Sequence, residues 1–274
     1  MSVIALDHVT LAIAGRTILA DISLAIGEAE FVGVLGPNGA GKTTLFRAIL
    51  GLLPAAKGTV TVLGRPARRG NSTIGYLPQV RTNVPGLRLS GRDFIASSIG
   101  GERFGLPFLD TERREELDHA LAIVGAEELA RRPFGAMSGG ERQRLLLAQA
   151  VIGRPRVLLL DEPLISLDPR HQQLVIELAR RLCREFKMTV LFSAHELNQL
   201  IGAIDRVLYL GSGQAALGTI DEVITPPVLS RLYDGPIEVV HAGGRIFVLS
   251  GAGDVESGAH LHEHEDAHGH HGHP

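Results

Sequence analysis

The run GPNGAGKTT at residues 36–44 matches the pattern G-x-x-x-x-G-K-[ST], which forms a phosphate-binding loop. The five residues before it, 31–35 (FVGVL), are apolar and typical of a buried strand. The residues after it, 44–50, are predicted to form a helix. Strand, loop and helix in this order are the context that the motif requires, so the sequence predicts an α/β fold around a nucleotide triphosphate.

The loop offers three kinds of contact to a triphosphate. Its glycines let backbone N–H groups turn inward as a nest for anions, and the helix start adds partial positive charge. Lys42 is expected to reach the β- and γ-phosphates, while the Thr43 hydroxyl is expected to bind Mg²⁺. The predicted nucleotide-binding residues of the loop are Gly36, Pro37, Asn38, Gly39, Ala40, Gly41, Lys42, Thr43 and Thr44.

A second apolar run, residues 157–160 (VLLL), ends in two carboxylates, Asp161 and Glu162. Because side chains alternate across a strand, these two groups need not have the same role. Asp161 suits the shell of Mg²⁺, through a water molecule. Glu162 suits polarising the attacking water as a general base.

Residues 138–141 (SGGE) are typical of a helix start, with Ser138 as the N-cap and Glu141 as its capping-box partner. Two glycines in the first turn lower the helix propensity and leave backbone N–H groups uncovered, which favours an anion. Since the loop at 36–44 surrounds only one side of a triphosphate, we expect a second copy of the chain, placed head to tail, to present this helix start to the other side. A well-capped helix without a binding role is the alternative.

Six short motifs in this order resemble the ABC ATPase family over roughly residues 3–225. The motifs are GPNGAGKTT, Gln79 in YLPQ, MSGGE at 137–141, LLLDEP at 158–163, Ser166-Leu167-Asp168, and His195 in FSAHEL. The resemblance implies that Gln79 senses Mg²⁺ and a transmembrane partner, and that His195 holds the γ-phosphate in line with Glu162. The implied catalytic residues are Lys42, Gln79, Glu162 and His195, and the implied Mg²⁺ ligands are Thr43, Gln79 and Asp161.

The same resemblance implies contacts across a dimer. Ser138, Gly139 and Gly140 would bind the γ-phosphate held by the other chain, and Asp168 would lie in the loop that joins the two sites. ATP and Mg²⁺ are the implied substrate and cofactor.

The chain departs from the family pattern at two places. The signature motif usually ends in Gln, and here it ends in Glu141, whose charge near a triphosphate is costly unless the carboxylate stays on its own backbone as a cap. Residues 1–30 contain no aromatic side chain to stack on adenine, and Ile13 lies near the expected position. We therefore expect an apolar contact to adenine from Ile13.

The predicted fold is a P-loop NTPase (RecA-like) α/β core with an N-terminal antiparallel β subdomain and an inserted helical subdomain. The predicted parts are an ATPase domain at 1–235 with its helical subdomain at about 83–150, a hairpin extension at 236–251 and a disordered histidine-rich tail at 252–274. The front edge of the helical subdomain, residues 83–103, is expected to face a membrane partner.

Composition excludes several classes of protein. A net charge of −3 without a long basic run disfavours nucleic acid as the main partner. The single cysteine, Cys183, allows no disulfide framework, in keeping with a reducing compartment. The N-terminus is not typical of a signal peptide. The sequence contains no run of 18 or more apolar residues, the length that a helix needs to span a bilayer. Any membrane location is therefore expected to come from a partner, on the cytoplasmic face of the cell membrane.

The end of the chain is rich in histidine, the commonest ligand for metals such as Zn²⁺ and Ni²⁺. These residues are His260, His262, His264, His268, His270, His271 and His273. Their spacing fixes no geometry and names no single metal. Adventitious binding without a role is the alternative.

The sequence thus favours the ATPase subunit of a membrane transporter that takes up a divalent transition metal. Residues 83–94 (NVPGLRLSGRDF) and 235–250 (GPIEVVHAGGRIFVLS) also resemble zinc and manganese importer ATPases. The expected partners are a second copy of the chain, an integral membrane permease that contacts the region after Gln79, and a periplasmic or lipoprotein metal-binding protein. Two alternatives remain open, a soluble ABC ATPase that acts on DNA or ribosomes and a metal-storing or chaperone ATPase without a pore.

Overall fold

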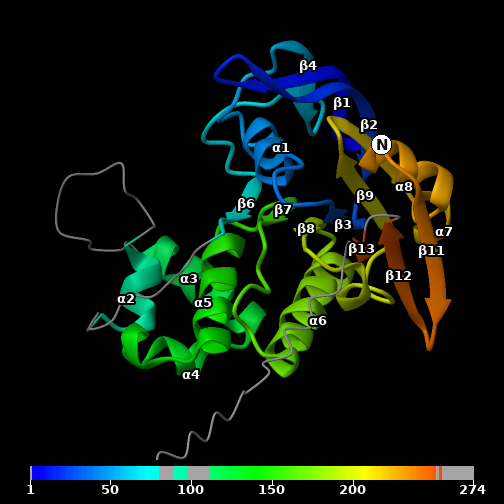
Figure 1. The fold of residues 1–274 in the computed structure, drawn as a ribbon. Helices are drawn as coiled ribbons and strands as arrows, with labels where there is room; N and C mark the ends of the chain where they lie inside the picture. Colours follow the sequence, from blue (N-terminus) through cyan, green and yellow to red (C-terminus); the bar gives the residue numbers. More distant parts are fainter. Residues whose placement is uncertain (1, 80–88, 98–110, 251–252, 255–274) are drawn as a thin grey trace, which may run out of the picture.

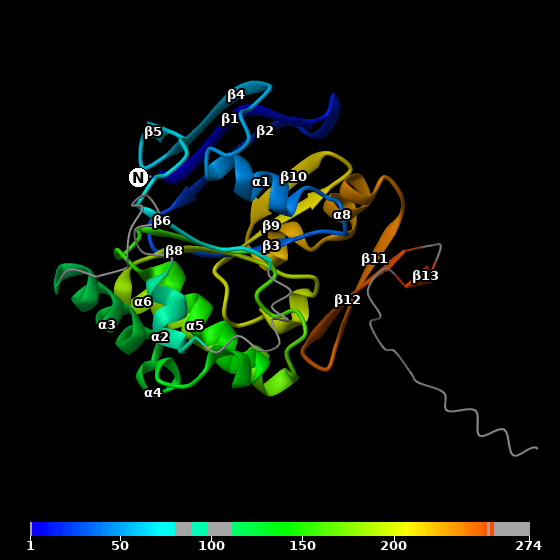
Figure 2. The ribbon, with the colours of Figure 1, turned by 90° about the vertical axis from the view of Figure 1, so that its left-hand side faces the viewer.

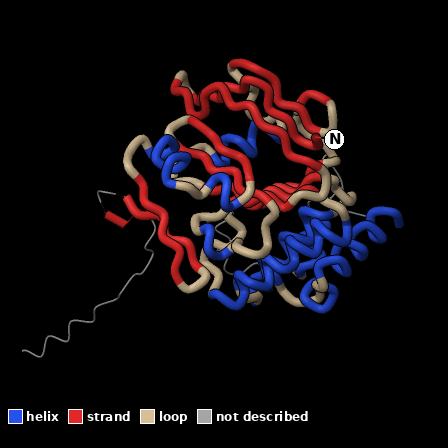
Figure 3. Tube along the Cα trace, turned by 90° about the vertical axis from the view of Figure 1, so that its right-hand side faces the viewer, coloured by secondary structure: helices blue, strands red, loops and turns tan. Residues whose placement is uncertain are grey.

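The computed structural model describes residues 2–79, 89–97, 111–250 and 253–254. Strands in these residues form three sheets, and most of the helices lie beneath the central sheet, on the side away from the N-terminal strands (Figures 1 and 3). In the part of the chain that the structure describes, we find no helix with the length and apolarity needed to cross a bilayer.

The N-terminal sheet is antiparallel, in the order β2-β1-β4-β5. Its strands are β1 (Ser2–Ile13), β2 (Arg16–Gly27), β4 (Lys57–Val62) and β5 (Arg65–Pro66). The antiparallel β subdomain predicted at the N-terminus is confirmed, and β1 and β2 each run for 12 residues. Irregularities in their register, such as the one between Leu6 and Val9, keep the apolar side chains on the buried face where strict alternation fails.

The central sheet has six strands in the order β10-β9-β3-β8-β7-β6, parallel throughout except for β10. Its strands are β3 (Phe31–Leu35), β6 (Ile74–Leu77), β7 (Val157–Leu160), β8 (Thr189–Ser193), β9 (Arg206–Gly211) and β10 (Gln214–Gly218). The strands predicted at 31–35 and 157–160 are confirmed as β3 and β7, and the apolar strand β8 lies between them. Every residue of these three strands is buried, as expected for a parallel sheet covered on both faces.

The two faces of the central sheet belong to two apolar cores. Val157 and Leu159 of β7 point into the core that contains α1 (Lys42–Ile49) and the antiparallel sheet, so α1 lies between the two sheets (Figure 2). Leu158 and Leu160 point into the other core, which is formed with the helices. Burial of each such side chain stabilises the fold by about 1.5–3 kcal/mol, so this strand holds both layers to the sheet.

A group of helices forms the predicted helical subdomain. It consists of α2 (Gly91–Ala96), α3 (Thr111–Val124), α4 (Glu127–Ala130), a 3-10 turn η1 (Phe134–Ala136) and α5 (Gly139–Val151). The rings of Phe94 and Phe134 stack with centroids 4.0 Å apart and tie α2 to the turn before α5. The proposed partner-facing edge at 83–103 lies largely outside the described residues.

The chain ends in further helices and a hairpin. The elements are α6 (Pro169–Phe186), η2 (Leu197–Gln199), α7 (Ile220–Val223), α8 (Pro226–Tyr233), β11 (Ile237–Ala242), β12 (Arg245–Ser250) and β13 (Gly253–Asp254). The predicted hairpin is observed as β11 and β12, which pair antiparallel around Gly243 and Gly244. The Asn198 side chain exchanges two hydrogen bonds of 2.9 Å with the backbone of Ile246, so the hairpin is tied to the segment after β8.

Candidate active site

Four neighbouring strands of the central sheet end at one edge and carry the predicted polar residues there. The loop at 36–44 follows β3, Gln79 follows β6, Asp161 and Glu162 follow β7, and His195 follows β8. Since β3, β8, β7 and β6 are adjacent and parallel, residues far apart in sequence meet at their carboxyl ends, where open α/β sheets bind ligands.

A cavity of about 420 Å³ lies at this edge. It is lined by Ile18, Asn38, Gly39, Ala40, Gly41, Lys42, Thr43, Thr44, Gln79, Glu162, Ile165 and His195. Seven residues of the predicted loop therefore share one cavity with the carboxylate, amide and imidazole predicted to act on the triphosphate. Gly36, Pro37 and Asp161 lie outside this lining.

The loop keeps its shape because three of its glycines, Gly36, Gly39 and Gly41, have positive φ. Gly36 has φ 136°, and a Cβ there would lie 2.1 Å from the carbonyl oxygen of Leu210 at the end of β9. Gly41 has φ 105° and is the N-cap of α1, so the helix begins at Lys42, two residues earlier than the sequence predicted. The start of α1 therefore faces the cavity with uncovered N–H groups.

The buried Lys42 ammonium is held by the loop itself. Its Nζ donates to the carbonyl oxygen of Gly36 at 2.7 Å and approaches that of Pro37 at 3.4 Å. An ammonium buried among carbonyl oxygens is a point charge fixed beside the cavity, which suits it to bind a phosphate oxygen.

Asp161 lies behind the cavity in a buried polar cluster. The hydroxyl of Ser193 donates to its Oδ1 at 3.0 Å, and the Tyr76 hydroxyl donates to Oδ2 at 3.4 Å. Burial, together with the charge of Asp161, raises the pKa of Tyr76 to about 12, so this phenol stays a donor at neutral pH. Ser193 also accepts from the backbone N–H of Glu162 at 2.8 Å, which joins the end of β7 to the end of β8.

Glu162 lies in the cavity wall and contacts two other residues of the lining. Its Oε1 lies 3.1 Å from Nε2 of His195, and its Oε2 accepts a hydrogen bond from the side-chain amide of Gln79. Its backbone has φ 51°, a left-handed conformation that costs on the order of 1 kcal/mol or more for a residue with a Cβ. This turn presents the carboxylate to the cavity while the preceding Asp161 stays buried.

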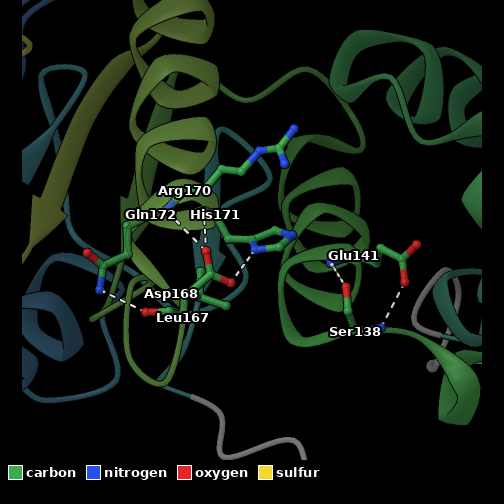
Figure 4. Close-up of polar contacts among 7 residues, drawn as sticks. All are labelled: Ser138, Glu141, Leu167, Asp168, Arg170, His171 and Gln172. Atoms are coloured by element: carbon green, nitrogen blue, oxygen red, sulfur yellow. Dashed lines mark hydrogen bonds and ion pairs between the residues drawn. The ribbon is translucent and has the colours of Figure 1, made fainter.

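The helix start at Ser138 lies outside the cavity lining. Ser138 is the N-cap of α5, and the predicted capping box is confirmed, with the Ser138 N–H donating to Glu141 at 2.8 Å and the Glu141 N–H donating to the Ser138 hydroxyl at 3.3 Å (Figure 4). Arg132 pairs with the other carboxylate oxygen of Glu141. The N–H of Ser138 and the Arg132 guanidinium hold the pKa of Glu141 below its usual range. The charge of Glu141 is thus kept on its own backbone and balanced.

Asp168 begins α6 next to this helix start. Its Oδ1 accepts from the backbone N–H groups of Arg170 and His171, both at 3.1 Å, and its Oδ2 lies 2.5 Å from Nδ1 of His171 (Figure 4). These bonds, the His171 side chain first, hold the pKa of Asp168 below its usual range, so the carboxylate is charged at neutral pH. Like Ser138, Asp168 lies outside the cavity lining.

The arrangement was compared with known proteins. A family model described as "ABC transporter" matches residues 19–165. The chain belongs to the ABC transporter family. It is an ABC ATPase, which hydrolyses ATP to drive transport.

Relatives of this ABC ATPase match most of its length. The manganese transport system ATP-binding protein MntB of Bacillus subtilis is 33% identical over 84% of this chain and 92% of its own. The zinc import ATP-binding protein ZnuC of Ruegeria pomeroyi is 35% identical over 96% and 98%. The hemin import ATP-binding protein HmuV of Bordetella pertussis is 33% identical over 89% and 97%. The ADP conformation of an ATP-binding cassette shares the fold, with a TM-score of 0.74 at 20% identity over 86% of this chain and 99% of that one.

The ABC ATPase has the residues that ATP and Mg²⁺ require. The cavity is lined by the phosphate-binding loop, which carries the Thr43 hydroxyl, and by the Gln79 amide. The buried Asp161 carboxylate directly precedes Glu162 of the cavity wall. Hydroxyl, amide and carboxylate oxygens are the ligands that Mg²⁺ prefers. The donor set therefore fits the cofactor that the family uses.

Sequence reasoning missed four residues of this site, namely Ile18 and Ile165 in the cavity lining and Ser193 and Tyr76 beside Asp161. Ile18 lines the cavity, whereas the predicted adenine contact, Ile13, lies outside the lining at the end of β1 with 41% of its surface exposed. Ser193 and Tyr76 hold Asp161, but a Ser or Tyr at the end of an apolar strand carries no signal of such a role. Ile18 lies inside β2, directly before the buried Leu19, where the sequence carries no signal that separates a cavity residue from a core residue.

The predicted histidine ligands at 260–273 lie outside the described residues. Within residues 2–79, 89–97 and 111–250, no group of three His, Cys, Asp or Glu side chains is placed to hold a metal ion. Transition-metal binding by the tail stays a prediction.

Proposed function

We propose that the chain is the ATP-hydrolysing subunit of an importer for a divalent transition metal, zinc or manganese. The observation that carries this proposal is full-length similarity to a zinc import ATPase, over 96% of this chain and 98% of that protein. The manganese relative and the seven histidines at the end of the chain support the same class of substrate.

The contacts of Glu162 support its role as the general base for ATP + H₂O → ADP + phosphate. Its carboxylate would accept a proton from the attacking water, and its contact with His195 and its hydrogen bond from Gln79 hold it at the cavity. Lys42 and the N–H groups of the loop would bind the phosphates, and His195 would keep the γ-phosphate and Glu162 in line. Bound Mg²⁺ would neutralise charge on the β- and γ-phosphates.

The separation of the two halves of the site supports a head-to-tail homodimer. The loop, Gln79, Glu162 and His195 share a cavity, but Ser138, Gly139, Gly140 and Asp168 do not line it. In the proposed dimer these four residues face the ATP held by the other chain, so each ATP has contacts from two chains and neither chain hydrolyses it alone.

The proposed complex also contains an integral membrane permease and a periplasmic or lipoprotein metal-binding protein, with this subunit bound peripherally at the cytoplasmic face of the membrane. The permease contact is proposed at the segment after Gln79, residues 80–88, which lie outside the described part of the chain. The proposal includes no nucleic acid partner.

The metal content of cells that lack the gene tests the substrate. We expect lower zinc under limiting zinc, or lower manganese under limiting manganese, restored by the wild-type gene and not by a Glu162→Gln copy. Because a hemin import relative matches with 33% identity over 89% of this chain, growth on hemin as the iron source is measured in parallel. A defect confined to hemin would overturn the metal-ion substrate, and no defect under any of the three conditions would favour an ATPase without a pore.

The tail is proposed to be a metal buffer or sensor that is separate from the ATPase site. A chain that ends at Gly251 should hydrolyse ATP at the basal rate and lose most bound Zn²⁺ or Ni²⁺. Imidazole binds metal only when neutral, so the affinity of the full chain should fall as the pH drops through about 6.5. Calorimetric titration of both chains measures this, and equal metal stoichiometry in the two would contradict it.

A further inference from the structure

The starts of α5 and α6 are joined by one side chain, His171. It projects from the first turn of α6 toward the start of α5, and it lies between Asp168 and the residues 138–141 (Figure 4). Because Asp168 is charged and can only accept, Nδ1 of His171 carries the proton in their 2.5 Å contact. The imidazole is thus fixed on its own helix by the carboxylate that caps it.

The other edge of the same ring lies against Gly140. A Cβ on Gly140 would come within 2.1 Å of Cδ2, 2.6 Å of Cγ and 3.0 Å of Nε2 of His171. The three nearest atoms all belong to the ring, so the ring occupies the space where a side chain would stand. Gly139 is different, because a Cβ there would be in ordinary contact with Leu167 at 3.4 Å.

The loop that carries Asp168 is fixed from its other side as well. The Gln172 amide donates to the carbonyl oxygen of Leu167 at 3.0 Å (Figure 4). The same loop therefore has a fixed position relative to α6, where His171 fills the space beside Gly140 and Leu167 lies beside Gly139.

We propose that His171 is a positioning residue for ATP hydrolysis, which holds Gly140 and Asp168 at a fixed separation so that both meet the ATP of the opposite chain. This inference rests on the proposed two-chain site. The ring needs no contact with the nucleotide for this role. It acts as a spacer whose Nδ1–H fixes Asp168 and whose Cδ2 edge supports the backbone of Gly140.

Three substitutions of His171 separate the donor from the shape. Asn carries its amide nitrogen where Nδ1 lies and its oxygen where Cδ2 lies, so His171→Asn can make both contacts. Leu fills a similar space without a donor, and Ala removes both. We expect His171→Ala and His171→Leu to lower kcat about tenfold with KM for ATP changed by about twofold or less, since the phosphate-binding loop is untouched.

His171→Asn should restore kcat to within about threefold of the wild type. A wild-type kcat in His171→Ala or His171→Leu would overturn the proposal, because the donor would then be dispensable. A kcat in His171→Asn as low as that in His171→Ala would overturn it too, since an equivalent donor would not replace the imidazole. Circular dichroism of each full-length variant checks that it is folded. The kcat and the KM for ATP of each folded variant are then compared with those of the wild type.

The contact with Gly140 has its own test, which does not depend on activity. Gly140→Ala should lower Tm in the wild-type background and have no such effect in His171→Ala, where the clashing ring is absent. Gly139→Ala is the matched control and should not lower Tm in either background. An equal drop for Gly140→Ala in both backgrounds would overturn the contact.

Ser138→Arg, measured in the same assay, distinguishes this inference from the proposed function. If Ser138→Arg is fully active, the two-chain site itself fails. If Ser138→Arg is inactive while His171→Ala keeps the wild-type kcat, the two-chain site stands and only the role of His171 is wrong.

Discussion

The two halves of the proposed ATP site differ in how one chain builds them. The cavity half is assembled within the chain, because four adjacent parallel strands place Gln79, Glu162, His195 and the loop at one sheet edge. The signature half, Ser138 to Gly140, lies at a helix start in the helical subdomain, outside that cavity. The difference teaches that a complete set of motifs in one chain need not form one complete site.

Each half is also stabilised in a different way. In the cavity half, polar side chains hold one another, as Ser193 and Tyr76 hold Asp161. In the signature half, the side chains of Ser138 and Glu141 each accept a hydrogen bond from a backbone N–H at the start of their own helix. The uncovered N–H groups that remain at this helix start are what a partner's ATP could use.

The largest effect is expected from blocking the signature half. Ser138→Arg should leave ATP binding by the single chain intact and abolish turnover, because the bulky cation would occupy the place of the partner's phosphate. Mixing this chain with a Lys42→Ala chain gives heterodimers with one site carrying both lesions and one site carrying neither. Recovery of activity on mixing is the expected result. Its complete absence would mean that the halves do not come from different chains or that two intact sites are required together.

The next largest effect concerns the cavity half. Glu162→Gln should lower kcat by about 10²-fold or more, since an amide cannot accept the proton of the attacking water. ATP binding should persist, and size-exclusion chromatography with ATP should show a trapped dimer. Glu185→Gln, an exposed carboxylate on α6, is the matched control and should turn over normally. Near-normal turnover in Glu162→Gln would remove this residue from the role of general base.

A smaller effect is expected on the stability of the signature half. Glu141→Ala should lower the stability by about 1 kcal/mol, or about 2–4 °C in Tm, because the capping box is lost and Arg132 has no carboxylate beside it. Glu128→Ala removes an exposed carboxylate that pairs with Arg131 at 3.2 Å, and it should change Tm little.

The pH dependence of this contribution has a defined sign. Since the pKa of Glu141 is lowered in the folded state, its stabilisation is present above the unfolded pKa of about 4.3 and is lost as the pH falls below that value. The Tm difference between wild type and Glu141→Ala should therefore shrink toward pH 3. A difference that is constant between pH 7 and pH 3 would show that the charge of Glu141 is not involved.

The sequence predicted the elements that have strong local signals. The strand and loop before Lys42, the strand before Asp161 and the capping box at Ser138 appear where they were expected, and the helix after the loop begins two residues earlier. The meeting of Glu162 with His195 could not be derived from either residue, because strand order is a property of the whole sheet, and only the family resemblance implied it. Ser193 gave no signal at all, since a Ser that ends a buried strand is usual.

The start of the antiparallel sheet shows the same limit at a finer scale. The sequence predicted an antiparallel β subdomain at the N-terminus, but not the irregular register of β1 against β2. That register decides which Ile lies at the cavity. It places Ile18 on the wall and leaves Ile13 at the exposed end of β1, five residues away along the hairpin.

The smallest effect is expected on ATP affinity from substitutions of Ile18 and Ile13, which test where the cavity half ends. Ile18→Ala should weaken ATP binding several-fold because it removes apolar surface from the cavity wall. Ile13→Tyr should tighten it several-fold if adenine extends past Ile18 toward the end of β1, where an aromatic ring can add about 1 kcal/mol by stacking. Leu174→Tyr, at a residue with the same 41% exposure on α6, is the matched control and should leave the affinity unchanged. Fluorescence titration with an ATP analogue measures the affinity of all three variants. A weaker affinity for Ile18→Ala with an unchanged affinity for Ile13→Tyr would show that adenine reaches Ile18 but does not extend to Ile13.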